Sequence, residues 1–221
     1  MRKLAWLILL FPILLAGCHH RMGSDVAGSG KRVMEKRQIS PFTSISTEGA
    51  FTIEVTCQKN LSLEVEGDDN VLPLVKAEIS GNVLRLKNSG SYSVSDPVVF
   101  KISVPNLEAL SVSGAGKIDI KGMNNERFEI DSEGAPAITV SGSTELVDIK
   151  SNGAGRIDSH NLHALRAVVD SNGVSKIDLA VADKLDVTVS GPSSITYRGD
   201  PVVTKTVNGP GKVERREDEG A

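Results

Sequence analysis

Acidic side chains recur at multiples of about 20 residues in the second half of this 221-residue chain, as Asp119, Asp158, Asp178 and Glu214. A row of carboxylates suggests two kinds of chemistry, because paired acids cleave glycosidic bonds and clustered carboxylate oxygens bind calcium. A basic residue stands two positions before each acid, as Lys117, Arg156, Lys176 and Lys212. These cations would repel calcium and pair with the acids. We therefore expect two adjacent, solvated charge rows rather than a catalytic or calcium site.

Other residue types that carry chemistry are sparse. His160 and His163 have a spacing compatible with metal binding, but no cysteine and no further histidine stands near them in the sequence. Cys57 alternates with apolar residues in a strand-like segment, so we expect it in the core rather than as a reactive thiol. No nucleophile elbow or zinc signature is present. We therefore predict no catalytic residues, no metal and no cofactor.

A repeated phrase must position these residues. Six glycines stand 18 to 20 residues apart, each followed four positions later by a branched aliphatic residue. The glycines are Gly114, Gly134, Gly153, Gly173, Gly191 and Gly209, and the aliphatic residues are Ile118, Ile138, Ile157, Ile177, Ile195 and Val213. A fixed period of this length is typical of a solenoid, in which each coil buries its apolar face against the next. We expect an all-β, right-handed parallel β-helix of about six coils.

The segment before this repeat also has the pattern of strands. Apolar residues alternate with polar ones in 51–57, 61–65 and 98–104, which places their side chains on one face. Residues 71–77 are the one segment in which we expect a short helical turn, with Pro73 tolerated only at its start. Additional β-rich coils should therefore precede the regular ones.

The N-terminus has the pattern of a processing signal, with a basic start, an apolar run from Leu4 to Leu15, and small residues. The sequence Leu15-Ala16-Gly17-Cys18 resembles the lipobox of bacterial lipoproteins, which implies cleavage before Cys18 and acylation of its thiol, for example with palmitate. His19 after the cysteine resembles an outer-membrane sorting signal. We divide the chain into a signal peptide (1–17), a lipidated flexible tether (18–37), a folded head (38–213) and a charged tail (214–221).

Composition restricts the partners. The formal net charge is −3 and no basic cluster is present, which argues against nucleic acid. The chain has two cysteines, and lipidation of Cys18 would leave Cys57 without a partner for a disulfide bond. The single tryptophan belongs to the predicted signal peptide, so the mature chain lacks the aromatic platform that usually binds sugars.

Several motifs in one order resemble a known family. They are Glu48-Gly49-Ala50-Phe51, the stretch 63–70, Gly81-Asn82-Val83-Leu84, Val104-Pro105-Asn106-Leu107 and the stretch 111–116. Together with the repeat they resemble the putative auto-transporter adhesin, head GIN domain family over residues 39–213. The resemblance implies a parallel β-helix in a bacterial envelope protein, often a lipoprotein.

We therefore expect a non-catalytic, lipid-anchored module of the bacterial cell envelope, held at the outer membrane, that acts as an adhesin or through another envelope interaction. Its partners would be the membrane, through the lipid on Cys18, and a protein or glycan that the sequence does not identify. Two alternatives stay open. One is a self-assembling envelope scaffold, which would be a homo-oligomer, and the other is a carbohydrate-active enzyme that uses the acidic row.

Overall fold

The computed structural model describes residues 25–216, and their regular structure consists of strands and one short 3-10 turn. The elements in chain order are β1 (Val26–Ala27), β2 (Arg32–Lys36), β3 (Ser44–Glu48), β4 (Thr52–Cys57), β5 (Ser62–Asp68), η1 (Leu72–Leu74), β6 (Val75–Ser80), β7 (Val83–Asn88), β8 (Tyr92–Ser93), β9 (Val99–Val104), β10 (Ala109–Gly114), β11 (Lys117–Gly134), β12 (Ala137–Ser151), β13 (Arg156–Ser171), β14 (Lys176–Val189), β15 (Ser194–Arg198), β16 (Val202–Val207) and β17 (Lys212–Arg215). The predicted all-β solenoid is confirmed, and so is the predicted helical turn at Pro73.

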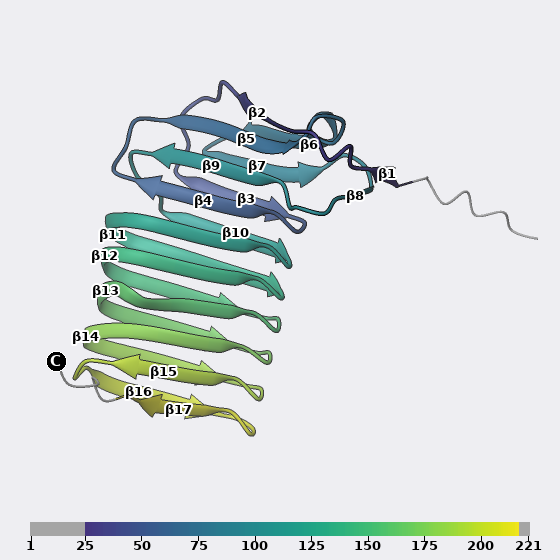
Figure 1. The fold of residues 1–221 in the computed structure, drawn as a ribbon. Coiled ribbons are helices and arrows are strands. Elements are labelled where there is room, and N and C mark those ends of the chain that lie inside the picture. The colour runs from purple at the N-terminus through teal and green to yellow at the C-terminus, as the bar shows by residue number, and fades with distance from the viewer. Residues whose placement is uncertain (1–24, 217–221) are drawn as a thin grey trace, which may run out of the picture.

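Apart from the separate β1–β8 pair, the strands form one continuous 15-stranded sheet that winds around a rod, and its two facing walls are called sheet 1 and sheet 2 here (Figure 1). Sheet 1 contains β6, β7, β3, β10, the second halves of β11 to β14, and β16. Sheet 2 contains β2, β5, β9, β4, the first halves of β11 to β14, β15 and β17. The long strands β11 to β14 bend from sheet 2 into sheet 1 at one edge of the rod. At the other edge the chain passes to the next coil through the glycine turns.

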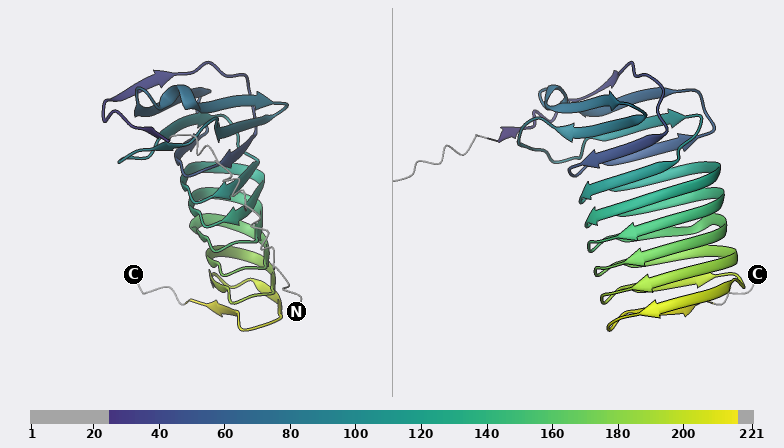
Figure 2. Two further views of the ribbon diagram at one scale, coloured as in Figure 1. Left: turned by 90° about the vertical axis from the view of Figure 1, so that its right-hand side faces the viewer. Right: turned by 180° about the vertical axis from the view of Figure 1, so that it is seen from behind.

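The pairing changes character along the rod. From β7 and β9 to the C-terminal end of the rod, each strand pairs in parallel with the next strand in the stack. At the N-terminal end, the pairs β2–β5, β5–β9 and β6–β7 are antiparallel. These antiparallel strands and the turn η1 close the N-terminal end of the solenoid (Figure 2). Inside this end, the rings of Phe51 and Phe100 pack edge to face with centroids 5.1 Å apart. The N-terminal end is thus a packed cap, while β16 and β17 end the stack at the other side.

Apolar side chains stack on corresponding positions of successive coils, as the repeat predicts. On sheet 2 the inner column runs from Phe100 and Ile53 through the isoleucines of the repeat to Val213. All its members are buried. A matching column on sheet 1 is Leu84, Ile45, Leu110, Ile130, Ile149, Val169 and Val187. Burying each such side chain contributes about 1.5–3 kcal/mol, so these columns supply a large share of the driving force for folding.

The glycine turns stack as closely as the apolar columns do. A Cβ atom added to Gly153 or Gly173 would lie 2.0 or 1.9 Å from the carbonyl oxygen of the preceding glycine in the column. A positive φ, the usual reason for glycine at a tight turn, occurs in this column at Gly114, Gly134 and Gly209 only. At Gly153, Gly173 and Gly191 the requirement is instead the close approach of one backbone to the next.

Three predictions need correction: two segment boundaries and the number of coils. The predicted tether 18–37 contains β1 and β2, and β2 pairs with β5 through its backbone, so the folded head begins near residue 26. The predicted tail 214–221 begins too early, because Glu214 and Arg215 belong to β17. The solenoid has about five turns rather than six, since six glycine turns bound five coils. The predicted signal peptide, Cys18 and residues 217–221 lie outside the described residues.

Candidate functional site

The two charge rows form in the predicted register on the outer surface of sheet 2. In the strand register, Arg156 lies beside Lys176 of the next coil, and Asp158 lies beside Asp178. The rows neutralise each other, because the Arg156 guanidinium lies 3.6 Å from the Asp158 carboxylate and 3.1 Å from that of Asp178. Lys121 and Asp119, at 2.8 Å, and Lys212 and Glu214, at 2.9 Å, form further pairs. These carboxylates are therefore engaged by cations.

Asp178 departs from the expectation of a solvated row, because its residue is only 5% exposed. Its Oδ2 accepts a hydrogen bond from Arg156, while its buried Oδ1 has no hydrogen-bond partner. Asp158 contacts the imidazole of His160. Partial burial opposes ionisation of Asp158, but the hydrogen bond and the charge of His160 outweigh it, so the pKa of Asp158 is lowered. Within residues 25–216, no group of three His, Cys, Asp or Glu side chains is placed to hold a metal ion.

Cys57 lies in the core, as its place in the alternating pattern predicts. Its residue is 2% exposed, and burial raises the pKa of its thiol to about 11. At neutral pH the thiol is therefore protonated and is a poor nucleophile. Cys18, the predicted lipidation site, lies outside the described residues.

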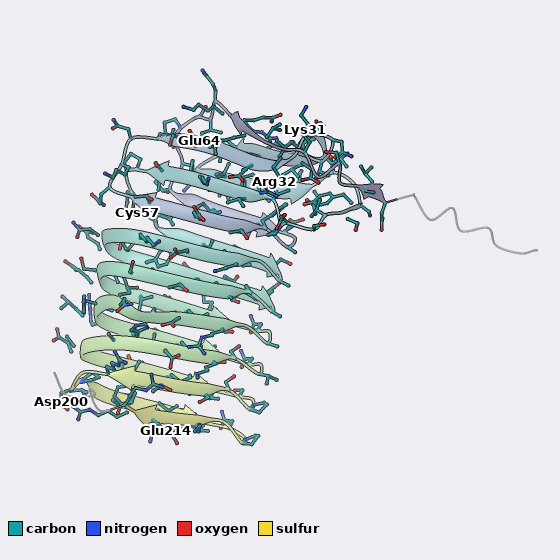
Figure 3. All side chains as sticks on the ribbon, viewed as in Figure 1. Lys31, Arg32, Cys57, Glu64, Asp200 and Glu214 are labelled. Carbon is teal, nitrogen blue, oxygen red and sulfur yellow. The ribbon has the colours of Figure 1, made fainter. Side chains whose placement is uncertain are left out.

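The two histidines lie in an irregular part of β13, on the edge of the rod opposite the glycine turns. Figure 3 marks this edge by the labels of Cys57 and Asp200. The register between β13 and β14 shifts between Ser159 and His163, because β13 contains extra residues there. The coil from Gly153 to Gly173 is two residues longer than the next one. The longer coil bulges outward at this edge and places His160 and His163 beside a surface depression.

We call this depression the β13 hollow. It has a volume of about 360 Å³ and is lined by His160, Asn161, His163, Ala164, Ala180, Val181, Ala182, Arg198 and Gly199. Its shape follows from the ladder of pairs, in which His163, Ala180 and Arg198 occupy successive coils. Successive coils lie about 4.8 Å apart, so the Cα atoms of His163 and Arg198 are separated by about 10 Å, with the methyl side chain of Ala180 between them. The small side chain of Ala180 between two long ones leaves the space open.

The polar side chains that line the hollow are neutral or basic. Arg198 and the two histidines line it, and no acidic residue does. Within residues 25–216 no carboxylate lies in ion-pair distance of Arg198, while nearby Asp200 pairs with Arg215 at 3.0 Å. The arrangement presents hydrogen-bond donors and a fixed positive charge, which suits an anion. Sequence analysis singled out both histidines but missed Arg198 and Asn161. The unequal coil lengths were the one available signal.

No helix among residues 25–216 has the length and apolar character needed to cross a membrane. The fold and surface together define a β-solenoid domain with ion-paired charge rows on sheet 2 and a polar hollow beside β13. The chain belongs to the putative auto-transporter adhesin, head GIN domain family, whose model matches residues 41–201. Membership supports an adhesin-like role at the cell surface or envelope.

Solved structures of bacterial proteins share this fold. A putative adhesin from Bacteroides fragilis aligns with a TM-score of 0.70 and 22% identity, covering 86% of this chain and all of the other. A putative lipid binding protein from Parabacteroides distasonis aligns with a TM-score of 0.55 and 19% identity, covering 88% of this chain and 100% of the other. A putative adhesin from Parabacteroides merdae has a TM-score of 0.54 and 19% identity, with coverages of 87% and 99%. At these identities the likeness concerns the fold. No curated protein matches the chain in sequence.

Proposed function

We propose that this protein is a lipid-anchored, non-catalytic binding module of the bacterial envelope, held at the outer membrane through Cys18. The observation that carries the proposal is the rod-like solenoid of an adhesin family, whose charge rows on sheet 2 are ion-paired and whose β13 hollow lies away from the N-terminal end. Hydrogen-bond donors and acceptors and small apolar patches on a rigid frame are surface features suited to recognition.

The position of the N-terminus supports an orientation in which the cap faces the membrane. The chain enters the fold at β1, beside the cap, and the coils extend away from that end (Figure 1). Between Cys18 and Val26 the chain can span at most about 30 Å, since an extended residue covers about 3.5 Å. A lipid on Cys18 would therefore hold the cap near the membrane and direct β14 to β17 outward.

Lipidation is tested by replacing Cys18. The Cys18→Ser variant is expected to lose labelling by an alkyne analogue of palmitate and to leave the membrane fraction almost completely, because the thiol is the acylation site. Acyl chains anchor through about 0.8 kcal/mol per buried methylene. Cys57→Ser is the matched control, since it removes the other cysteine of the chain and should keep both the label and the membrane location. An unlabelled wild-type chain would contradict the anchor.

Binding is tested with fluorescent liposomes that carry the full chain. We expect saturable retention on some members of a panel of immobilised glycans and proteins, at least tenfold above protein-free liposomes, with no change in the mass of the glycans. Retention at the level of bare liposomes on the whole panel would overturn the binding role. Cleavage of a glycan that disappears in the Asp158→Ala and Asp178→Ala variants would instead establish the carbohydrate-active enzyme.

The open end of the rod favours one alternative, the self-assembling scaffold, because β16 and β17 have one unpaired edge each within the described residues. Strand edges of this kind pair readily with other chains. However, Lys205 takes the place of an aliphatic residue in the inner column of β16, and Lys212 and Arg215 stand on β17. Two such ends would bring a Lys205 side chain from each rod to the junction, whereas Lys212 and Arg215 are already paired with Glu214 and Asp200. Light scattering of the detergent-solubilised chain separates a monomeric binder from a scaffold.

A further inference from the structure

The β13 hollow has the features of a binding site that the family match does not assign. We propose that it binds the acid group of an acidic saccharide, with Arg198 and His163 as the main contacts to the carboxylate. This inference rests on the proposed binding function and identifies the part of the surface and the class of ligand.

The charge of the hollow selects an anion. Arg198 is partly buried, lines the hollow, and forms no ion pair with any carboxylate among residues 25–216. Three acids of the neighbouring coils are engaged elsewhere, Asp158 by His160 and Arg156, Asp178 by Arg156, and Asp200 by Arg215. Asp183 follows the lining residue Ala182 in the chain but does not itself line the hollow. A guanidinium can donate two parallel hydrogen bonds to one carboxylate, and such charge-assisted bonds are about twice as strong as neutral ones. An anion in the hollow would therefore meet a cation that is not already neutralised.

The floor and the rim select a ring that carries hydroxyl groups. Ala180 and Ala182 contribute apolar surface, with the buried Ala164 and Val181 beside them, and the C–H face of a sugar can pack against this surface. The amide of Asn161 and the imidazole of His160 also line the hollow, and the Asn161 amide and the ring nitrogen of His160 that does not contact Asp158 can each form a hydrogen bond with a hydroxyl. A volume of about 360 Å³ lies at the small end of the range for ligand sites, which suits one or two sugar rings.

The position of the hollow fits recognition at a distance from the membrane. It is built from β13, β14 and β15, in the half of the rod remote from the cap (Figure 1). The residues that shape it stand on strands, so the site is held by the hydrogen-bonded coils. Ala180 determines its depth, because the same ladder carries His163 on one side and Arg198 on the other.

The test compares two ligands that differ by one acid group. Binding of methyl glucuronide and of methyl glucoside is measured by calorimetry on the full chain, in a detergent with a polyoxyethylene head group so that no detergent sugar competes. We expect the glucuronide to bind at least tenfold more tightly. Arg198→Ala and Ala180→Leu should each weaken glucuronide binding at least tenfold, the first by removing the charge and the second by filling the hollow.

Arg166→Ala is the matched control, since it removes an exposed arginine from the sheet 1 half of β13 and alters the net charge equally. Its glucuronide affinity should stay within twofold of wild type. Equal binding of both sugars, no glucuronide binding, or wild-type affinity in the Arg198 variant would overturn the proposal. Inorganic phosphate that binds more tightly than the glucuronide would overturn the saccharide as ligand. If liposomes adhere but the Arg198 variant adheres equally well, the site is wrong while the proposed binding role stands.

Discussion

Replacing Ile157 by aspartate is expected to unfold the solenoid. Ile157 is 0% exposed and stands between Ile138 and Ile177 in the inner column of sheet 2. An aspartate there would be either a charge without a partner or a protonated acid with unsatisfied hydrogen bonds, and it would also remove apolar contacts with both neighbouring coils. We expect a loss of more than about 4 kcal/mol in the free energy of unfolding, which is a large part of the stability of an ordinary domain.

Urea denaturation followed by circular dichroism measures this loss. The control is Ala137→Asp, which introduces the same side chain at an exposed position one residue before Ile138. Ala137 pairs with Lys117 on one side and Arg156 on the other, so an aspartate at this site gains cationic neighbours. Its midpoint should stay close to that of wild type. A cooperative transition at the wild-type midpoint for Ile157→Asp would contradict the role of the aliphatic column.

Replacing Gly173 by alanine should have the second largest effect, although it adds one methyl group. The new Cβ would lie 1.9 Å from the carbonyl oxygen of Gly153. This same oxygen accepts the backbone hydrogen bond from Val174, at 2.9 Å, so the turn cannot move away without losing that bond. We expect destabilisation by about 2–4 kcal/mol, at or beyond the upper range for overpacking, because backbone rather than a flexible side chain must shift.

The urea midpoint again gives the magnitude, and hydrogen exchange should locate the weakened protection in the coils of β13 and β14. Gly90→Ala is the matched control, since the atom closest to its added Cβ would be Leu74 Cδ2 at 3.8 Å. Gly90 does not adopt a positive φ. Alanine at that position should be neutral or slightly stabilising, because it restricts the unfolded chain. Equal stability of the two variants would mean that the glycine column is not required for stacking.

The errors of the sequence analysis have physical causes. The sequence predicts a tether at Arg32-Val33-Met34-Glu35-Lys36 because this segment is polar and follows glycines and serines, whereas the structure has strand β2 there. In the fold it pairs with β5 through backbone hydrogen bonds, supported by Arg32 with Glu66 at 3.3 Å and Lys36 with Glu64 at 3.4 Å. An edge strand that buries little side-chain surface leaves no periodic signal of its own. Its partner is about 30 residues away in the sequence.

The β13 hollow shows a second limit. Counting three residues after each isoleucine of the repeat would align His160 with Ala180 and Arg198. The bulge in β13 places His163 on that ladder instead. Two extra residues in one coil indicate a bulge somewhere, but the sequence does not say which residues leave the ladder. The alanine gap and the position of Arg198 beside it follow only from the register.

The sequence by itself determined the stack: apolar residues at a fixed period, glycines at the turns, and paired charge rows outside, because each coil repeats the same contacts with its neighbours. The tertiary structure decided where that repetition ends or fails, namely the antiparallel cap, the burial of Asp178 and the hollow beside Arg198. The cap and the hollow arise where the repeating register breaks, and the burial of Asp178 depends on the side chains packed around it, none of which a period encodes.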